Sequence, residues 1–367
     1  MKKIFLLYLF ILSMLLSCSI QKEPIPIIKD TSDNKTIVLS KNIEVITTSL
    51  NIPWELVFLP SGEMLVTERP GNLLKISQDK KVIRIEGVEH RGEGGLLGLA
   101  LHPDFKQNNL IYLYLTTRSN GGLVNRVERY KFLGDELTDK KIIIDNIPGA
   151  SFHDGGRIAF GSDKMLYITT GDAGDTSNAQ DKDSLAGKIL RLNDDGSIPS
   201  DNPFATAIYS YGHRNVQGIT WDSNGKLWAT EHGRSGITSG FDELNFIVKG
   251  ENYGWPDIEG DKTKKSMTAP VIHSGASDTW APSGALYYKG SIFFAGLRGE
   301  ALYEAKISDG KVTALKEHFK GKFGRLRTVI LGPDGYLYIL TNNRDGRGTP
   351  SADDDRIIKI NPSVFEV

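Results

Sequence analysis

Three of the seven histidines lie in segments whose residue types suit acid–base chemistry or ligand binding. His153 stands before Asp154 and a pair of glycines, and a histidine held by such a turn can serve as a general base near neutral pH. In residues 212–215 a second histidine is followed by Arg214 and Asn215, which offer donors to an anion or to a polarised oxygen. The alternative for each segment is structural: a histidine satisfied by hydrogen bonds within its turn, or an arginine exposed on a loop.

The third segment, residues 231–234, follows a short apolar strand and contains Gly233 and Arg234. Downstream lie Glu243 and Tyr253, in stretches rich in oxygen donors. Backbone carbonyls and carboxylates are ligands that Ca²⁺ takes in proteins, but the spacing is not that of an EF-hand and does not by itself specify the ion. The chain has one cysteine and no His-Glu-x-x-His pair, which argues against a zinc site.

Arginines gather in two further segments, around Arg298 and at residues 324–327. If Arg325 and Arg327 belong to one strand, they point to the same side of it. Two guanidinium groups on one face favour a ligand with several carboxylates or a phosphate. The alternative is a pair of solvent-exposed arginines.

The elements that must position these residues form a repeat. A turn precedes a short strand in six copies, whose aligned apolar residues are Leu65, Leu110, Leu166, Leu227, Ile292 and Leu337. The copies are separated by steps of 45, 56, 61, 65 and 45 residues, and a second strand follows each of them. One such unit cannot bury both of its faces, whereas six units stacked around an axis can. We therefore predict an all-β, six-bladed β-propeller over residues 37–367.

Residues 37–50 precede the first copy, and the last copy ends near the C-terminus. We expect this N-terminal segment to supply the outer strand of the C-terminal blade, because that pairing closes the ring without an open edge. Two packed β-sandwiches are the alternative, but they do not explain one recurring unit. The candidate segments lie directly before or after repeat strands, so a propeller places them on one face.

The charge balance limits the partners of the chain. Lys and Arg number 44 against 45 Asp and Glu, which gives a net charge of −1. Binding of nucleic acid phosphates needs a basic excess, so we expect no nucleic-acid partner.

The N-terminus is typical of an exported protein. Residues 1–17 contain two lysines and an apolar run that is short for a membrane span, as in a signal peptide. The run ends at Cys18 in a sequence that resembles the lipobox of bacterial lipoproteins, and Cys18 is the only cysteine of the chain. An ordinary signal peptide with a chance cysteine is the alternative. We expect lipidation of Cys18, a flexible tether over residues 18–36, and anchoring in the bacterial cell envelope, where Ser19 favours the outer membrane.

Taken together, the motifs resemble those of the soluble PQQ-dependent glucose dehydrogenase and aldose sugar dehydrogenase family, from about Trp54 to Asn361. The segments that carry the resemblance are residues 94–105, 153–157, 187–192, 212–218, 252–256, 281–284 and 325–327. The resemblance implies oxidation of an aldose at C1 to a lactone, with PQQ and Ca²⁺ as cofactors. It also implies a separate electron acceptor, such as a quinone or a cytochrome.

The matching positions imply roles for individual residues. His153 would take the proton of the anomeric hydroxyl while hydride passes to the quinone, and Arg214 would stabilise negative charge on the reduced cofactor. Further cofactor contacts would come from Asn215, Arg298, Arg325 and Arg327.

The resemblance also implies the calcium ligands. Carbonyls of Gly233 and Arg234 would hold the ion that polarises the quinone. Glu243 and the Tyr253 region would hold a second, structural ion.

The sequence departs from the family pattern at three of these positions. Glu93 replaces an amide residue, Phe152 replaces an acid beside His153, and Arg234 replaces a proline. We expect Glu93 and Trp280 to contact the sugar, Trp280 as part of an aromatic wall. Two other functions stay open: a propeller that binds a ligand without catalysis, and a calcium-dependent lactonase-like hydrolase, which would need clustered acidic side chains.

Overall fold

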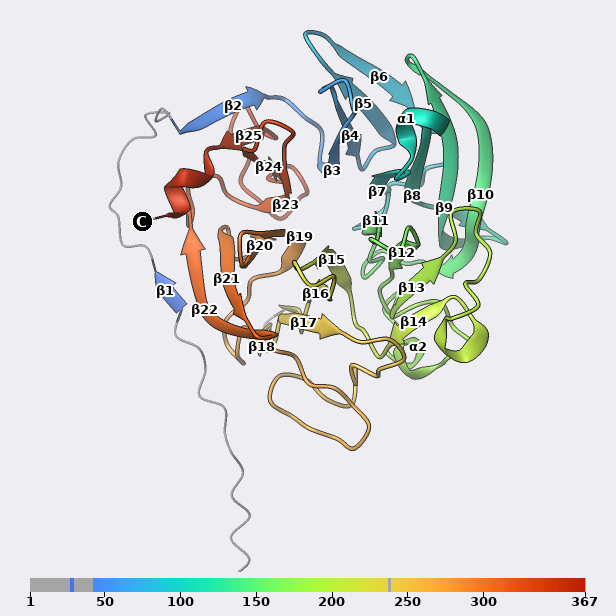
Figure 1. Ribbon diagram of the computed structural model, residues 1–367, viewed down its shortest axis with the longest axis vertical. Helices are drawn as coiled ribbons and strands as arrows, with labels where there is room; N and C mark the ends of the chain where they lie inside the picture. The colour runs from blue at the N-terminus through green and yellow to red at the C-terminus, as the bar shows by residue number, and fades with distance from the viewer. Residues whose placement is uncertain (1–26, 30–41, 237–238, 367) are drawn as a thin grey trace, which may run out of the picture.

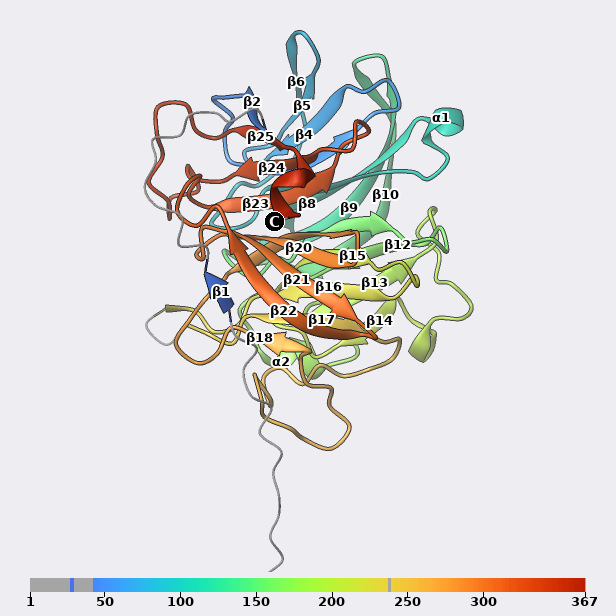
Figure 2. The same cartoon turned by 60° about the vertical axis from the view of Figure 1, so that its left-hand side comes forward.

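Six β-sheets are arranged around a central axis in the computed structural model, which describes residues 27–29, 42–236 and 239–366 (Figures 1 and 2). Five sheets have four strands, and one has a fifth strand at its edge. The prediction of an all-β, six-bladed propeller is confirmed. The described helices are short and are α1 (Phe105–Asn108), α2 (Ser177–Gln180), η1 (Pro203–Ala205) and η3 (Pro362–Phe365).

Each of the first three blades is an antiparallel sheet of four consecutive strands. Blade 1 contains β3 (Pro53–Phe58), β4 (Met64–Glu68), β5 (Asn72–Ile76) and β6 (Lys80–Arg84). Blade 2 contains β7 (Leu96–Leu101), β8 (Leu110–Ser119), β9 (Gly122–Leu133) and β10 (Glu136–Pro148). Blade 3 contains β11 (Ile158–Phe160), β12 (Leu166–Thr169), β13 (Lys188–Leu192) and β14 (Ile208–Tyr211).

The other three blades follow the same order along the chain. Blade 4 contains β15 (Val216–Trp221), β16 (Leu227–Glu231), β17 (Glu243–Ile247) and β18 (Ile272–His273). Blade 5 contains β19 (Pro282–Tyr288), β20 (Ser291–Gly296), β21 (Leu302–Ser308) and β22 (Lys311–His318). Blade 6 contains β23 (Leu326–Leu331), β24 (Leu337–Thr341) and β25 (Ile357–Ile360).

Two N-terminal strands complete the outer edges. β2 (Ile43–Thr47) pairs antiparallel with β25 and forms the fourth strand of blade 6. β1 (Ile27–Lys29), which lies within the predicted tether, pairs parallel with β22 of blade 5. Cys18, residues 1–17 and the rest of the tether fall outside the described residues. In the described part of the chain, no helix is long and apolar enough to cross a membrane.

The sequence repeat corresponds to the second and third strands of every blade. All six aligned apolar residues lie in second strands, namely β4, β8, β12, β16, β20 and β24. The turn before such a strand uses glycine where the backbone is left-handed, as at Gly225 (φ 73°) and Gly335 (φ 79°). Leu65, Leu166 and Ile292 are fully buried, because each blade packs face to face against its neighbours.

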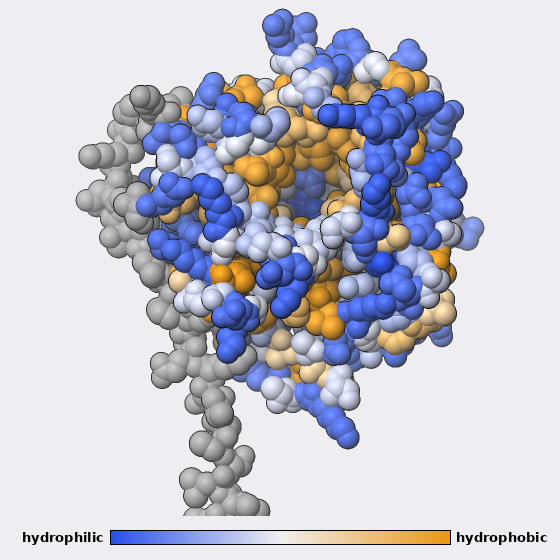
Figure 3. All heavy atoms as spheres, in the orientation of Figure 1, coloured by the Kyte–Doolittle hydropathy of each residue, from blue (hydrophilic) through white to orange (hydrophobic). Residues whose placement is uncertain are grey.

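The axis of the ring is polar, although the core between the blades is apolar. Arg157 donates to the Glu55 carboxylate and, at 2.9 Å, to the backbone oxygen of Gln217. Arg327 donates to the side-chain oxygen of Gln217 at 2.6 Å. In space-filling view the centre of the ring is hollowed, with hydrophobic residues around a hydrophilic floor (Figure 3).

Candidate functional site

The candidate residues lie at one end of the blades because adjacent strands run antiparallel. The first strand of a blade begins at this end, and the second strand of the same blade ends there. His153 and Arg214 precede the first strands β11 and β15, while Asp172 and His232 follow the second strands β12 and β16. The structure therefore brings together segments that are far apart in the sequence.

The strongest candidate for acid–base chemistry is a pair formed by His153 and Asp172. The Nδ1 atom of His153 lies 2.7 Å from Oδ1 of Asp172, and the His153 side chain retains 12% of its exposure. An ionised carboxylate only accepts hydrogen bonds, so Nδ1 carries the hydrogen and Nε2 is left to accept a proton. His153 adopts a left-handed backbone (φ 62°) in the loop before β11.

Asp172 is held as a carboxylate by three donors. Burial alone would raise its pKa, but His153, the Gly174 amide at 2.8 Å and the Trp255 indole at 2.9 Å lower it below the usual value. Asp172 was not among the predicted site residues, although it follows a repeat strand in the sequence Gly171-Asp172-Ala173-Gly174. At Gly171 a Cβ atom would lie 1.9 Å from the His153 carbonyl oxygen, so glycine is required for the two loops to meet.

The Glu93 side chain is hydrogen bonded to the loop that contains His153. One oxygen of its carboxylate accepts from the His153 amide at 3.0 Å, and the other accepts from Arg347 at 2.7 Å. Burial raises the pKa of Glu93, but Arg347, His232 and the His153 amide outweigh it and bring the value to about 2. Both oxygens have protein partners, but 18% of the side chain stays exposed, so the expected sugar contact stays a prediction.

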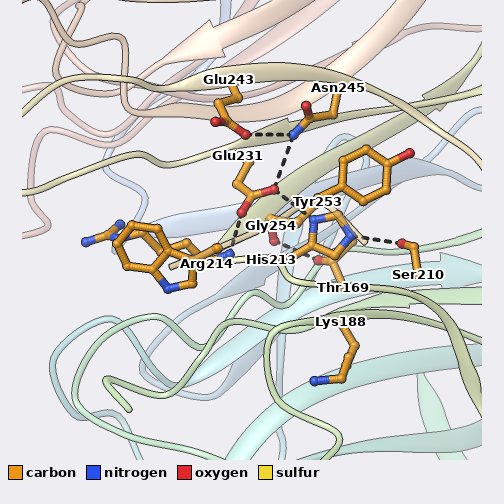
Figure 4. A network of polar contacts seen from close by, with 12 residues as sticks. Thr169, Lys188, Ser210, His213, Arg214, Glu231, Glu243, Asn245, Tyr253 and Gly254 are labelled. Atoms are coloured by element: carbon orange, nitrogen blue, oxygen red, sulfur yellow. Dashed lines mark hydrogen bonds and ion pairs between the residues drawn. The ribbon is translucent and has the colours of Figure 1, made fainter. Parts of the chain in front are cut away.

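Arg214 is positioned by a buried network that begins in blade 4 (Figure 4). The Glu231 carboxylate accepts from the Arg214 amide and lies 2.9 Å from Nδ1 of His213, while Nε2 of His213 lies 2.8 Å from the Ser210 hydroxyl. The Arg214 guanidinium lies over the Trp255 ring at 5.3 Å and donates to Ser235 at 2.9 Å. His213 is thus a structural residue, because its ring is fully buried and both nitrogens are engaged.

The Asp242 carboxylate holds the loop after β16 in place by accepting hydrogen bonds from backbone amides. Oδ1 of Asp242 accepts from the Gly233 amide at 2.8 Å, and Oδ2 accepts from the amide of Trp280 at 2.7 Å. The Arg234 side chain pairs with Glu259 at 3.1 Å and covers the Phe241 ring at 4.7 Å. These contacts hold the Arg234 side chain against neighbouring residues of the same blade.

A small pocket behind this loop is lined by Gly233, Glu243 and Tyr253, three of the four expected calcium residues, together with Glu231 and Glu259. Burial, followed by repulsion from Glu231, raises the pKa of Glu243 to about 8. Among the described residues no three His, Cys, Asp or Glu side chains converge as a metal-binding group, so a cation here would also need backbone carbonyls.

The arginines of blade 6 are buried but are not equivalent. Arg325 pairs with Asp345 at 2.7 Å, so its charge is matched. Arg327 donates to Gln217 and to Asn342, and burial, together with the charge of Arg69, lowers its pKa well below the usual value. Arg69, which follows β4 and was not among the predicted site residues, is 3% exposed and donates to the Gly92 carbonyl.

Two expected contacts have different surroundings. Arg298 is exposed beside the loop after β16, with Nη1 3.5 Å from the Gly236 carbonyl. Trp280 is 1% exposed and packs against Phe294 and Tyr303 in the core of blade 5. The expectation that Trp280 forms an aromatic wall is therefore wrong, because its ring offers no exposed face; Trp255 is the aromatic residue beside Asp172 and Arg214.

We call the end of the ring at which His153, Arg214 and His232 lie its mouth. Several polar atoms near this mouth have no hydrogen-bond partner within the described residues. They are Nδ2 of Asn215, Nε2 of His232, Nε of Arg69 and Nη2 of Arg157. Burial lowers the pKa of His232 to about 4, so its ring is neutral. Buried polar groups are normally satisfied, and such a set at one mouth is typical of a binding site.

Comparisons with known proteins agree with this geometry. The family model described as glucose / sorbosone dehydrogenase matches residues 50–351. Aldose sugar dehydrogenase YliI of Escherichia coli is 34% identical over 343 residues, which cover 83% of this chain and 91% of that protein.

Solved structures give the same result. The PQQ-bound aldose sugar dehydrogenase of Streptomyces coelicolor is 40% identical, with a TM-score of 0.81 over 87% of this chain and 97% of that chain. A putative oxidoreductase (glucose dehydrogenase) of Thermus thermophilus is 42% identical, with a TM-score of 0.82 over 87% and 99% of the two chains. The ring of six blades, the residues gathered at its mouth and these similarities show that the chain belongs to the glucose / sorbosone dehydrogenase family.

Proposed function

We propose that the chain is a PQQ-dependent dehydrogenase that oxidises an aldose at C1 to a lactone. The observation that carries the proposal is the His153–Asp172 pair, set beside a group of buried cations at the mouth of the ring. The names of the similar proteins support the cofactor and the class of substrate.

The residues present fit a quinone that bears three carboxylates. Arg69, Arg214 and Arg327 are each at most 6% exposed and form no ion pair with a carboxylate among the described residues. Buried charges are normally paired, so this surplus favours an anionic ligand. Arg214, Asn215, Arg298, Arg325 and Arg327 are the residues that would hold it, and Asn215 Nδ2 and Arg69 Nε have donor capacity to spare.

When bound, PQQ would accept the hydride from C1 of the sugar. Nε2 of His153 takes the proton of the C1 hydroxyl, because Nδ1 is occupied by Asp172. The Asp172 carboxylate stabilises the imidazolium that results and fixes the plane of the ring. Arg214, whose guanidinium lies over the Trp255 ring, supplies positive charge beside the pair.

A direct experiment tests this function. Purified protein freed of cofactor is titrated with PQQ in the presence of Ca²⁺ while the quinone absorbance is followed, and aldoses are then offered with a reducible dye. Saturable binding and aldose-dependent dye reduction are expected. A protein that does not bind the quinone would contradict the proposal.

We also propose a structural Ca²⁺ ion in the pocket lined by Glu243 and Tyr253, separate from the ion that the carbonyls of Gly233 and Arg234 would hold beside PQQ. The half-buried Glu243 side chain lines this pocket together with Glu231, and a bound cation would relieve the repulsion between the two carboxylates. The raised pKa gives a signed prediction for the metal-free protein. Since the pKa of Glu243 rises from 4.5 to about 8 on folding, its contribution to stability is fully present below pH 4.5 and is lost as the pH rises through about 8.

Calcium is therefore expected to raise Tm more at pH 8 than at pH 5, because the ion binds the ionised carboxylate. Thermal melts with Ca²⁺ and with a chelator measure both effects. Glu243→Gln should flatten the pH dependence and abolish the response to Ca²⁺, whereas the exposed Glu86→Gln should behave as wild type. An equal response to calcium at both pH values would speak against this site.

We further propose that the protein is exported and anchored through a lipid on Cys18, on the basis of the lipobox-like sequence. Cys18→Ser is expected to move the protein from the membrane fraction to the soluble fraction, with its activity intact. Fractionation after labelling with a fatty acid measures both the anchor and its loss. Membrane association that survives in the variant would refute the lipid anchor.

A further inference from the structure

Lys188 is a fully buried lysine that the proposed reaction does not use. It lies in β13 and is 0% exposed. Its Nζ donates to three backbone carbonyls, those of Asn178 at 2.6 Å, Ala186 at 2.7 Å and Ala179 at 3.2 Å. An ammonium group has three donors, and all three are used.

The cage around Lys188 contains carbonyls and no acid. Among the described residues no carboxylate lies within ion-pair distance of its Nζ, and in Figure 4 Lys188 stands apart from the contacts that join Ser210, His213 and Glu231. Burial lowers the pKa of Lys188 to about 8, so the ammonium form prevails at neutral pH. The side chain therefore behaves as a fixed internal cation within a ring of carbonyl oxygens.

The three carbonyls belong to both ends of one loop. Asn178 and Ala179 are in α2, and Ala186 lies just before β13. The Lys188 backbone also pairs with Thr170, its amide donating to the hydroxyl and its carbonyl accepting from the amide, at 2.9 Å each. Lys188 thus closes the loop of residues 171–187, which begins at the end of β12 and includes Asp172.

Two side chains of α2 extend from this closed loop to the groups that hold His153. Nδ2 of Asn178 donates to the Asp172 carbonyl at 3.0 Å. Nε2 of Gln180 donates to the Trp255 carbonyl at 2.6 Å, and the Trp255 indole in turn donates to the Asp172 carboxylate. A displacement of α2 would therefore reach Asp172 by two routes.

We propose that Lys188 is a positioning residue for the His153–Asp172 pair, acting as an internal cation that fixes α2 against the end of β12. The proposal rests on the function proposed above, in which His153 is the base. Its alternative is a lysine that only fills the core of blade 3, with no selective effect on the pair.

Lys188→Met tests this by keeping the length of the side chain and removing the charge and the donors. In the full-length protein with PQQ and Ca²⁺, kcat is expected to fall about 10- to 100-fold, the size of effect that a misplaced catalytic group produces, while KM changes less than about threefold. Ser177→Ala, an exposed α2 residue whose side chain contacts only Asp175, is the matched control and should keep the wild-type kcat.

A second readout does not depend on turnover. A histidine Nδ1 hydrogen bonded to a carboxylate gives a downfield proton resonance. In the described part of the chain two such pairs lie near the mouth, His153–Asp172 and His213–Glu231. Lys188→Met should lose or broaden the first signal, which His153→Gln identifies. The second signal should change less: the Ala179 and Gly187 carbonyls also accept from the Gly212 and His213 amides, but the His213 ring is held by Glu231 and Ser210. Retention of both signals together with a wild-type kcat would overturn the proposal.

If Lys188→Met does not fold, two other variants test the same proposal. Asn178→Ala removes the hydrogen bond to the Asp172 carbonyl, and Gln180→Ala removes the hydrogen bond to the Trp255 carbonyl. Each should weaken the His153 signal and lower kcat while the His213 signal persists. Wild-type behaviour of both variants would also overturn the proposal. A wild-type protein that shows these signals but does not oxidise aldoses with PQQ would instead contradict the proposed function.

Discussion

His153→Gln is expected to lower kcat for aldose oxidation by about 10²- to 10⁴-fold, the range that a general base contributes. Glutamine keeps a polar side chain in the loop but cannot accept the proton at neutral pH. In the described structure the His153 ring forms no hydrogen bond with the buried arginines, so binding of PQQ should be nearly unchanged. Steady-state kinetics with dye reduction and an absorbance titration with PQQ measure the two quantities separately.

The matched control is His318→Gln. His318 lies in β22 and pairs with Glu304 at 2.9 Å, so it is another histidine–carboxylate pair, but it belongs to an outer strand. Its replacement should leave kcat within about twofold of wild type. If His153→Gln retained most of the activity, His153 could not be the base.

Asp172→Asn is the second substitution that we expect to lower kcat strongly. An amide can donate to Nδ1 of His153 and so favour the ring form that carries its hydrogen on Nε2, where the proton must be accepted. The expected loss of kcat is about 10³- to 10⁴-fold, as when the orienting carboxylate of a Ser-His-Asp triad is replaced by an amide. The imidazolium would also lose its stabilising charge.

Glu304→Gln serves as the control for this variant, because it removes the carboxylate of the outer pair and leaves the mouth of the ring intact. Loss of PQQ binding in Asp172→Asn, in place of loss of kcat, would show that Asp172 shapes the cofactor site and does not orient His153. An unchanged kcat would remove Asp172 from the mechanism.

Some strands of each blade could be predicted from the sequence and others could not, and the difference has a physical cause. Second strands such as β4, β16 and β24 are buried along their whole length between blades, so they read as short apolar runs after a turn. Outer strands such as β6 face solvent and carry lysines and arginine, so their sequences resemble loops. The sequence therefore shows the repeat through its buried strands, but it does not show that each blade has four strands.

The residues of the candidate site also divide into those that the sequence predicts and those that it does not. His153, Arg214 and Arg327 stood out because imidazole and guanidinium groups beside glycines are poorly explained by packing. Asp172 and Lys188 did not, because an aspartate after a strand or a lysine within one is ordinary in sequence and acquires its role from what surrounds it. Trp280 was misassigned, since the sequence does not tell whether an indole faces a cleft or the core.

By itself, the sequence determined the number of blades, the face on which the loops meet and the chemical types that they bring there, because these follow from periodicity and strand direction. Tertiary structure alone decided which side chains touch: that Asp172 pairs with His153, that Glu93 pairs with Arg347, and that Trp280 is buried. Such pairings join loops from different blades, and their geometry depends on how whole sheets pack around the axis, which no local pattern encodes.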